Sequence, residues 1–223
     1  HAAADAAKAI IDLNKFELVK NLDADPAENY RKFFLSAPGV EDIFFREYTV
    51  TSRTMAMERM NAPNGFGGWG GNCPMQNLVD DYEMSNGVPI EDGASGYDPQ
   101  DPYTDRDPRF YGTILYNGAS YRGREIETFL PGGKDSPAGN EPWNTSPTGY
   151  YLRKFLNENI SLEDWNSMGT SPWRYIRYAE ILLNYAEAQN EAVGPDQSVH
   201  DAINEIRNRA GMPNLPAGLS KEQ

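Results

Sequence analysis

The 223-residue sequence contains one cysteine, Cys73, and two histidines, His1 and His200. A single cysteine excludes an intrachain disulfide, and we interpret Cys73 as a packed thiol. His1 is terminal and His200 lies on the polar side of a predicted helix, so neither a Ser-His-Asp triad nor a Cys-His pair is expected. The 33 acidic residues are spread along the chain, so a close carboxylate pair would be no sign of a glycosidase. We therefore predict that the protein is not an enzyme.

Positive charge is also scarce. The sequence has 20 Lys and Arg residues against 33 Asp and Glu residues, which gives a net charge of -13. A polyanion repels phosphate groups, so nucleic acid and anionic lipid surfaces are not expected partners. No run of about 18 apolar residues is present, so no membrane span is predicted from the sequence. The acidity is compatible with a neutral ligand.

Hydrophobic residues make up only 39% of the chain, whereas there are 20 glycines and 16 prolines. This composition predicts long ordered loops. The loop-forming residues concentrate between positions 61 and 147, in NAPNGFGGWGGN, DGASGYDPQDP and PGGKDSPAGNEP. The many aromatic residues, 13 Tyr and 4 Trp among them, argue against disorder. Long ordered loops of this kind are usually functional.

Short elements are predicted before and within these loops. An alanine-rich amphipathic helix is expected at residues 2–13, with Ala6, Ala9, Ile10 and Leu13 at helical spacing. The other expectations are a helical turn at residues 30–35, a strand or extended segment at 41–54, a short helix at 75–82, and strands at 110–116 and 150–155.

A long helix is predicted to begin at Ser171-Pro172, with Ser as N-cap and Pro at the first helical position, and to end at Gly194-Pro195. Its two apolar rows predict packing between two neighbours. The rows are Ile176, Ala179, Leu183 and Ala186, and Tyr175, Tyr178, Leu182 and Tyr185. Because Leu183 belongs to a core row, its replacement by alanine is predicted to cost about 2–5 kcal/mol.

A second helix is predicted from Gln197 to Ala210, ending at Gly211. The short connection predicts an antiparallel hairpin, similar to a tetratricopeptide unit. The predicted fold class is therefore mainly α, with tetratricopeptide-like helical hairpins and a long loop-rich, partly β insertion. We expect one domain fragment over residues 1–223, comprising a helix and an extended core segment (1–60), an aromatic loop-rich region with short strands (61–170) and the helical hairpin (171–211).

Several sequence blocks carry a resemblance to a known family. They are WRYIRYAEILLNYAEAQNEA followed by AINEIRNRAGMP, and, in order before these, FELV, EDIFFRE, QNLVDDYEMSNGVPI, DRDPRFYGTIL and TGYYLRKF. Together they span nearly the whole chain, which resembles the SusD/RagB family. The resemblance implies a lipid-anchored protein at the outer-membrane surface of Bacteroidota, which captures nutrients for a SusC-like TonB-dependent transporter. It also implies a longer intact protein, so we expect this sequence to be truncated at both ends, without the lipidated cysteine.

Exposed aromatic residues on the loops are the candidate ligand contacts. Sugars offer flat C–H faces and rims of hydroxyls, so their sites combine stacking rings with hydrogen-bonding side chains. The glycine-rich loop 66–72 offers two rings and an amide, and glycine allows a ring to be presented outward. An alternative is that Trp69 plugs a core beneath the loop. The predicted ligand residues are Phe66, Trp69, Asn72, Trp143, Tyr97 and Tyr121. Tyr175, Tyr178 and Tyr185 are interpreted as helix-packing residues.

The loop from Glu91 to Asp107 is rich in acids, and several oxygen ligands are what Ca²⁺ requires. Its spacing does not match an EF-hand, so calcium is only an alternative here, and no other cofactor is predicted. Arg106 and Arg109 are interpreted as structural residues that form ion pairs with nearby carboxylates.

The favoured function is therefore glycan binding and delivery to a transporter. Peptide capture, which the family also includes, is one alternative. A helical-repeat scaffold that binds only another protein is a second alternative, although it would have little use for the aromatic loops.

Overall fold

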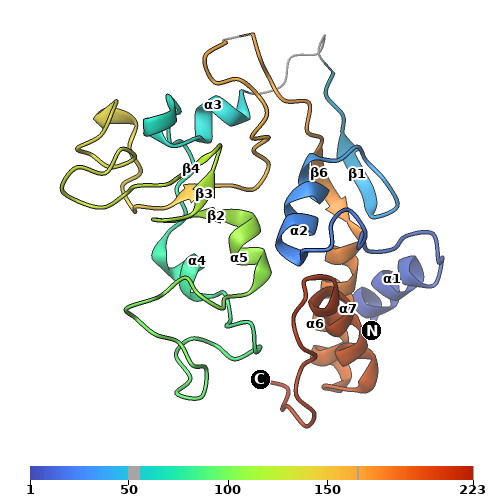
Figure 1. Ribbon diagram of the computed structural model, residues 1–223. Helices are drawn as coiled ribbons and strands as arrows, with labels where there is room; N and C mark the ends of the chain where they lie inside the picture. The colour runs from blue at the N-terminus through green and yellow to red at the C-terminus, as the bar shows by residue number, and fades with distance from the viewer. Residues whose placement is uncertain (50–55, 165, 223) are drawn as a thin grey trace.

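The computed structural model describes residues 1–49, 56–164 and 166–222. The N-terminal and C-terminal segments lie together on one side, and the middle of the chain forms the other side (Figure 1). The helices of the described residues are α1 (Ala2–Ile11), α2 (Pro26–Leu35), α3 (Met57–Asn61), α4 (Gln76–Asp80), α5 (Pro108–Thr113), α6 (Tyr178–Val193) and α7 (Gln197–Arg209). The fold is mainly α and tetratricopeptide-like, as predicted. Within the described ranges, no helix has the length and apolarity needed to cross a membrane.

Among the described residues, the strands are short and form three two-stranded antiparallel sheets. β1 (Asp42–Arg46) pairs with β6 (Trp173–Arg177), β2 (Ile114–Leu115) with β5 (Tyr151–Leu152), and β3 (Ser120–Tyr121) with β4 (Arg124–Glu125). The turn between β3 and β4 has positive φ at both Arg122 and Gly123, a conformation that suits the twist of a tight hairpin. The segment predicted at 41–54 contains β1, and its residues 50–54 lie outside the described residues.

The predicted helical hairpin is present as α6 and α7, which pack against each other and, through α6, against α1. α7 begins where the Asp196 side chain accepts hydrogen bonds from the N–H groups of Ser198 and Val199, and these bonds satisfy free donors of its first turn. The core between these helices holds mainly aliphatic and small side chains: Ala4, Ala7, Leu18, Ala179, Ile181, Leu182, Ala186, Val199, Ala202 and Ile206, with Tyr178 and Tyr185.

The predicted start of the long helix at Ser171-Pro172 is wrong. Residues Trp173–Arg177 form strand β6, and α6 begins only at Tyr178. The strand is held by the ladder with β1 and by a buried ion pair between Arg174 Nε and Asp42 Oδ1 at 2.6 Å. Because this partner is 132 positions away, a local helix-start pattern could not report it. Tyr175 is consequently a half-exposed strand residue that contacts Phe44, not a helix-packing residue.

The predicted burial of individual helix residues also needs correction. Leu183 is 49% exposed, whereas its neighbour Leu182 is 2% exposed and belongs to the core. In α1 the buried residues are Ala4 and Ala7, while Leu13 lies beyond the helix and is exposed. An alanine-rich helix has several similar faces, so its neighbour selects the one that is buried.

The middle of the chain is held by small aromatic clusters. The strand predicted at 110–116 is mostly helix α5, which Asp107 caps and Pro108 begins, and only Ile114–Leu115 is strand. α5 packs closely on α2, and Gly112 makes this approach possible, since a Cβ there would lie 3.0 Å from the Ala27 carbonyl oxygen. The elements predicted at 30–35, 75–82 and 197–210 are confirmed as α2, α4 and α7. Of the strand predicted at 150–155, only Tyr151–Leu152 is strand, which is β5.

Candidate functional site

The loop that contains Trp69 folds back on helix α3. The N–H of Trp69 donates to the carbonyl of Arg59 at 2.9 Å, and the N–H of Gly71 donates to the carbonyl of Met60 at 2.7 Å. The Trp69 side chain is 44% exposed, so it does not plug a core as the alternative held. The Asn72 amide donates to Asn61 Oδ1 at 2.5 Å, which fixes the end of the loop.

Trp143 lies on the 3-10 turn η2 (Pro142–Asn144) and is 79% exposed. This turn adjoins the Trp69 loop, because a Cβ added to Gly70 would lie 2.6 Å from the Asn144 carbonyl oxygen. Gly70 also has a φ of 53°, where a side chain would be strained. The residues that follow Trp69 and Trp143 are therefore in backbone contact, and the structure brings the two predicted tryptophans onto adjoining loops.

A buried polar network fixes these two loops. The Tyr151 hydroxyl lies 2.7 Å from Asn64 Oδ1 and 2.7 Å from the Asp135 carbonyl oxygen, and it accepts from the Ser146 N–H at 3.0 Å. Arg124 forms two hydrogen bonds to the Asp135 carboxylate, at 2.7 and 2.9 Å. Satisfied buried networks of this kind hold loops rigidly. The tryptophans are thus exposed on an ordered surface.

Phe66 is half-buried. The Arg124 guanidinium lies 3.7 Å from the centre of its ring, and the ring packs edge-on against Tyr121. Tyr121 itself is 1% exposed, and burial raises the pKa of its hydroxyl. A side chain so buried cannot contact a ligand, so the prediction of Tyr121 as a ligand residue is wrong. Its place on β3 turns the ring into the core shared with Tyr151.

Tyr97 lies in a different part of the loops, near Arg106, whose guanidinium is 5.5 Å from its ring. Arg106 donates to the carbonyl oxygens of Pro102, Val79 and Tyr82, so the predicted carboxylate partner is wrong for this residue. For Arg109 the predicted ion pair is present, with Asp107 at 2.5 Å. Both arginines hold the loop in place.

In the acidic loop 91–107, aspartate side chains accept hydrogen bonds that stabilise backbone turns. Asp92 and Asp98 each accept a hydrogen bond from the N–H two residues later, at 2.8 Å. No group of three His, Cys, Asp or Glu side chains suited to a metal ion occurs in the parts of the chain that the structure describes. Asp92 and Asp98 thus serve as turn residues in this loop.

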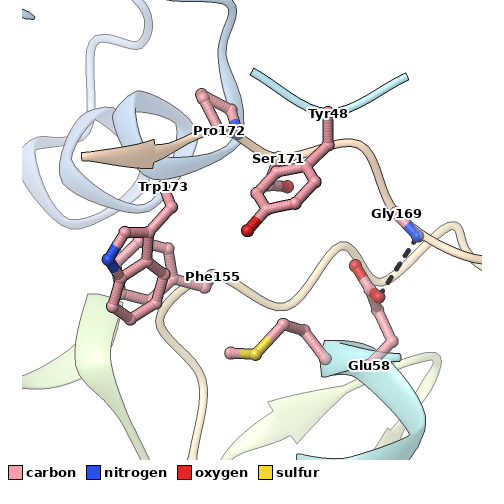
Figure 2. Close-up of a pocket in the computed structure, with 8 residues that line it drawn as sticks. Tyr48, Glu58, Phe155, Gly169, Ser171, Pro172 and Trp173 are labelled. Carbon is pink, nitrogen blue, oxygen red and sulfur yellow. Dashed lines mark hydrogen bonds between the residues drawn. The ribbon is translucent and has the colours of Figure 1, made fainter. Parts of the chain in front are cut away.

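A second feature was not predicted from the sequence. A small pocket lies between α3, β6 and the segments that flank them, lined by Tyr48, Met57, Glu58, Phe155, Gly169, Ser171, Pro172 and Trp173 (Figure 2). Its volume of about 20 Å³ is enough for about one water molecule. The sequence carries one signal for this pocket: Glu58 is the one acid in the methionine-rich stretch MAMERM, which predicts an apolar setting.

Burial raises the pKa of Glu58, which is 2% exposed, above its ordinary value of 4.5. Protonation therefore favours the folded state. The stability that this provides is fully present below pH 4.5 and is lost as the pH rises through the raised pKa. Relative to Glu58→Gln, which cannot ionise, the wild type is expected to lose stability as the pH rises above 4.5. Urea unfolding of both proteins at several pH values measures this difference.

Glu163→Gln is the matched control for that experiment. It removes the same negative charge, but from a side chain that is exposed. A Glu58→Gln difference that stays constant with pH, or follows that of the control, would contradict a raised pKa.

The chain is similar in sequence and in structure to proteins of a known family. The model of the SusD family matches residues 40–222. A SusD-like carbohydrate-binding protein from Bacteroides fragilis is 28% identical, with a TM-score of 0.79 over 97% of this chain and 42% of that one. Another SusD-like protein from Bacteroides fragilis is also 28% identical, with a TM-score of 0.75 over 98% of this chain and 45% of that one.

More distant structures share the fold alone. The surface glycan-binding protein A from Bacteroides uniformis is 20% identical, with a TM-score of 0.52 over 95% of this chain and 38% of that one. A search of curated proteins finds no match. The chain spans less than half the length of these solved relatives. Because the family model covers most of the sequence, the chain belongs to the SusD family.

Proposed function

We propose that this chain binds an oligosaccharide on the surface formed by Trp69 and Trp143. The observation that carries the proposal is that both rings are exposed, at 44% and 79%, on adjoining ordered loops. Exposed tryptophans cost free energy in water, and a sugar's C–H face is a suitable partner for them. Phe66 is half-buried on the same loop as Trp69, and Asn72 is exposed at the end of that loop.

The similarity to a SusD-like carbohydrate-binding protein supports this choice of ligand class. The proposed role is binding, with no catalytic step. We further propose that the intact protein acts as one SusD-like unit at the outer-membrane surface and passes the glycan to a TonB-dependent transporter. Affinity should be modest, because a few stacking contacts must offset the lost freedom of the ligand.

Replacing either tryptophan with alanine is expected to weaken glycan binding about tenfold, which corresponds to roughly 1.4 kcal/mol. The loss arises because a flat stacking surface is removed while the loop backbone keeps its own hydrogen bonds. The measurement is affinity electrophoresis of the full chain in gels containing starch, mannan, arabinan or chondroitin sulfate, followed by calorimetry on the glycan that retards it.

Tyr175→Ala is the matched control, since it removes another half-exposed ring, on β6 and away from the loops (Figure 1). Wild-type affinity in both tryptophan variants would remove this surface from the site. Unchanged circular dichroism of the variants is required for either conclusion.

A further inference from the structure

The Glu58 side chain is a buried carboxylate without a counter-ion among the residues that the structure describes. Its Oε1 accepts from the Asn157 N–H at 3.4 Å, and its Oε2 accepts from the Gly169 N–H at 3.3 Å. Both bonds are long, and the charge of Arg122 lowers the pKa of Glu58 by less than burial raises it. A buried carboxylate held in this way is costly, and a bound cation beside it would offset that cost.

The pocket beside Glu58 has electron-rich walls. Tyr48, Phe155 and Trp173 contribute aromatic rings, and the Phe155 and Trp173 rings stack at 5.3 Å and 22° (Figure 2). Met57 contributes a polarisable sulfur to the lining. Ring faces and a carboxylate together attract a cation, whereas neither would favour an anion.

The size of the pocket limits which cation can enter. Its volume of about 20 Å³ suits a group the size of a water molecule. A primary ammonium has this size, and a quaternary ammonium does not. The pocket is tight on the side of Gly169, where a Cβ would lie 2.2 Å from Glu58 Oε1.

We propose that this pocket binds a primary ammonium group, which forms an ion pair with Glu58 and lies against the rings of Tyr48 and Trp173. Two kinds of nutrient carry such a group, an amino sugar with a free amine and a lysine-containing peptide. The inference does not depend on the Trp69–Trp143 surface, because the two sets of residues are different.

Ligand-observed NMR on the full chain tests the proposal with butylammonium as the probe. Binding is expected at about millimolar concentration, the range for so small a ligand. Uncharged butanol, which has the same alkyl chain, should bind at least tenfold more weakly. Tetramethylammonium should not bind, because its four methyl groups exceed the pocket.

Glu58→Gln keeps the size of the side chain and removes its charge, so it should weaken butylammonium binding at least tenfold. Glu163→Gln makes the same change of charge on an exposed loop and should bind as the wild type does. Gly169→Ala, which displaces the carboxylate, should weaken binding as well. Folded spectra of each variant are the condition for comparing them.

Tri-glucosamine and trilysine distinguish the two sources of the ammonium group. If only one of these two oligomers binds, and if Glu58→Gln weakens that binding too, the result identifies the source of the ammonium group and supports the proposal. Equal binding of butylammonium to the wild type and Glu58→Gln overturns it, as does equal binding of butanol. Butylammonium binding without binding of either oligomer overturns a nutrient role for the pocket. The tryptophan variants should leave butylammonium binding unchanged, so failure of the glycan surface would be seen separately.

Discussion

Glu41→Ala is expected to lower the free energy of unfolding by about 3–5 kcal/mol, the usual cost of breaking a buried ion pair from one side. The Glu41 carboxylate is fully buried and accepts from Arg177 Nη1 at 2.7 Å, from Arg209 Nη1 at 3.1 Å and from the Val19 N–H at 2.9 Å. The variant leaves the Arg209 side chain, which is 1% exposed, without its carboxylate. Urea unfolding at pH 7 measures the loss.

The position of Glu41 in the fold explains why the effect should be large. Its side chain joins the segment before α2, strand β6 and helix α7, which are far apart in the sequence. Its carbonyl accepts from the N–H of Tyr178, where α6 begins. Burial already lowers the pKa of Arg209, so losing the carboxylate would leave a costly isolated charge.

The control is Glu205→Ala, since Glu205 lies 4.0 Å from Lys20 in a partly exposed pair. Such pairs contribute roughly 0–1 kcal/mol. If Glu41→Ala costs no more than Glu205→Ala, the buried network is not what holds the two ends of the chain together.

Leu182→Ala is expected to destabilise the protein by about 2–5 kcal/mol. Leu182 is 2% exposed in the core formed by α1, α6 and α7, so truncation leaves a cavity in addition to the lost burial. The midpoint of urea unfolding should fall. The slope of the transition should change little, because unfolding exposes nearly the same surface area in both proteins.

Leu183→Ala provides an unusually close comparison, with the same substitution one position later in the same helix. Leu183 is 49% exposed, and its replacement should change stability by about 0.5 kcal/mol or less. Similar losses in both variants would mean that α6 does not present this face to the core. The large loss of stability that the sequence predicted for Leu183→Ala is therefore expected for Leu182→Ala instead.

Local sequence signals were sufficient to predict several helices. Helix α7 has a capping aspartate before it, an apolar stripe along it and a glycine of φ 76° after it, and these signals lie within one stretch of chain. Its bounds were accordingly predicted to within one residue. In α5 the cap Asp107 and Pro108 were equally visible, but the β-forming residues that follow led to the wrong prediction.

The candidate site was predictable only in part. The glycine-rich loop 66–72 indicated Trp69, and the place of Trp143 between a proline and an asparagine made it a second candidate. Glycine at position 70 is what the contact between their loops requires. Tyr121 is also an aromatic residue of this region, but it is buried, because its place in the β3–β4 hairpin directs it into the core. The Glu58 pocket depends on residues from positions 48 to 173, and no local pattern joins them.

The sequence by itself determined the acidity of the protein, its mainly helical class, the family blocks and the loops that bear the tryptophans. These follow from composition and from patterns within about 20 residues, the range over which helix periodicity and turn chemistry act. Only the tertiary structure decided that Trp173–Arg177 is a strand, that Leu182 is buried and not Leu183, and that Glu58 lines a pocket. Strand pairing, helix-face burial and pocket walls each require a partner distant in the chain, and the energy of that partner outweighs local preference.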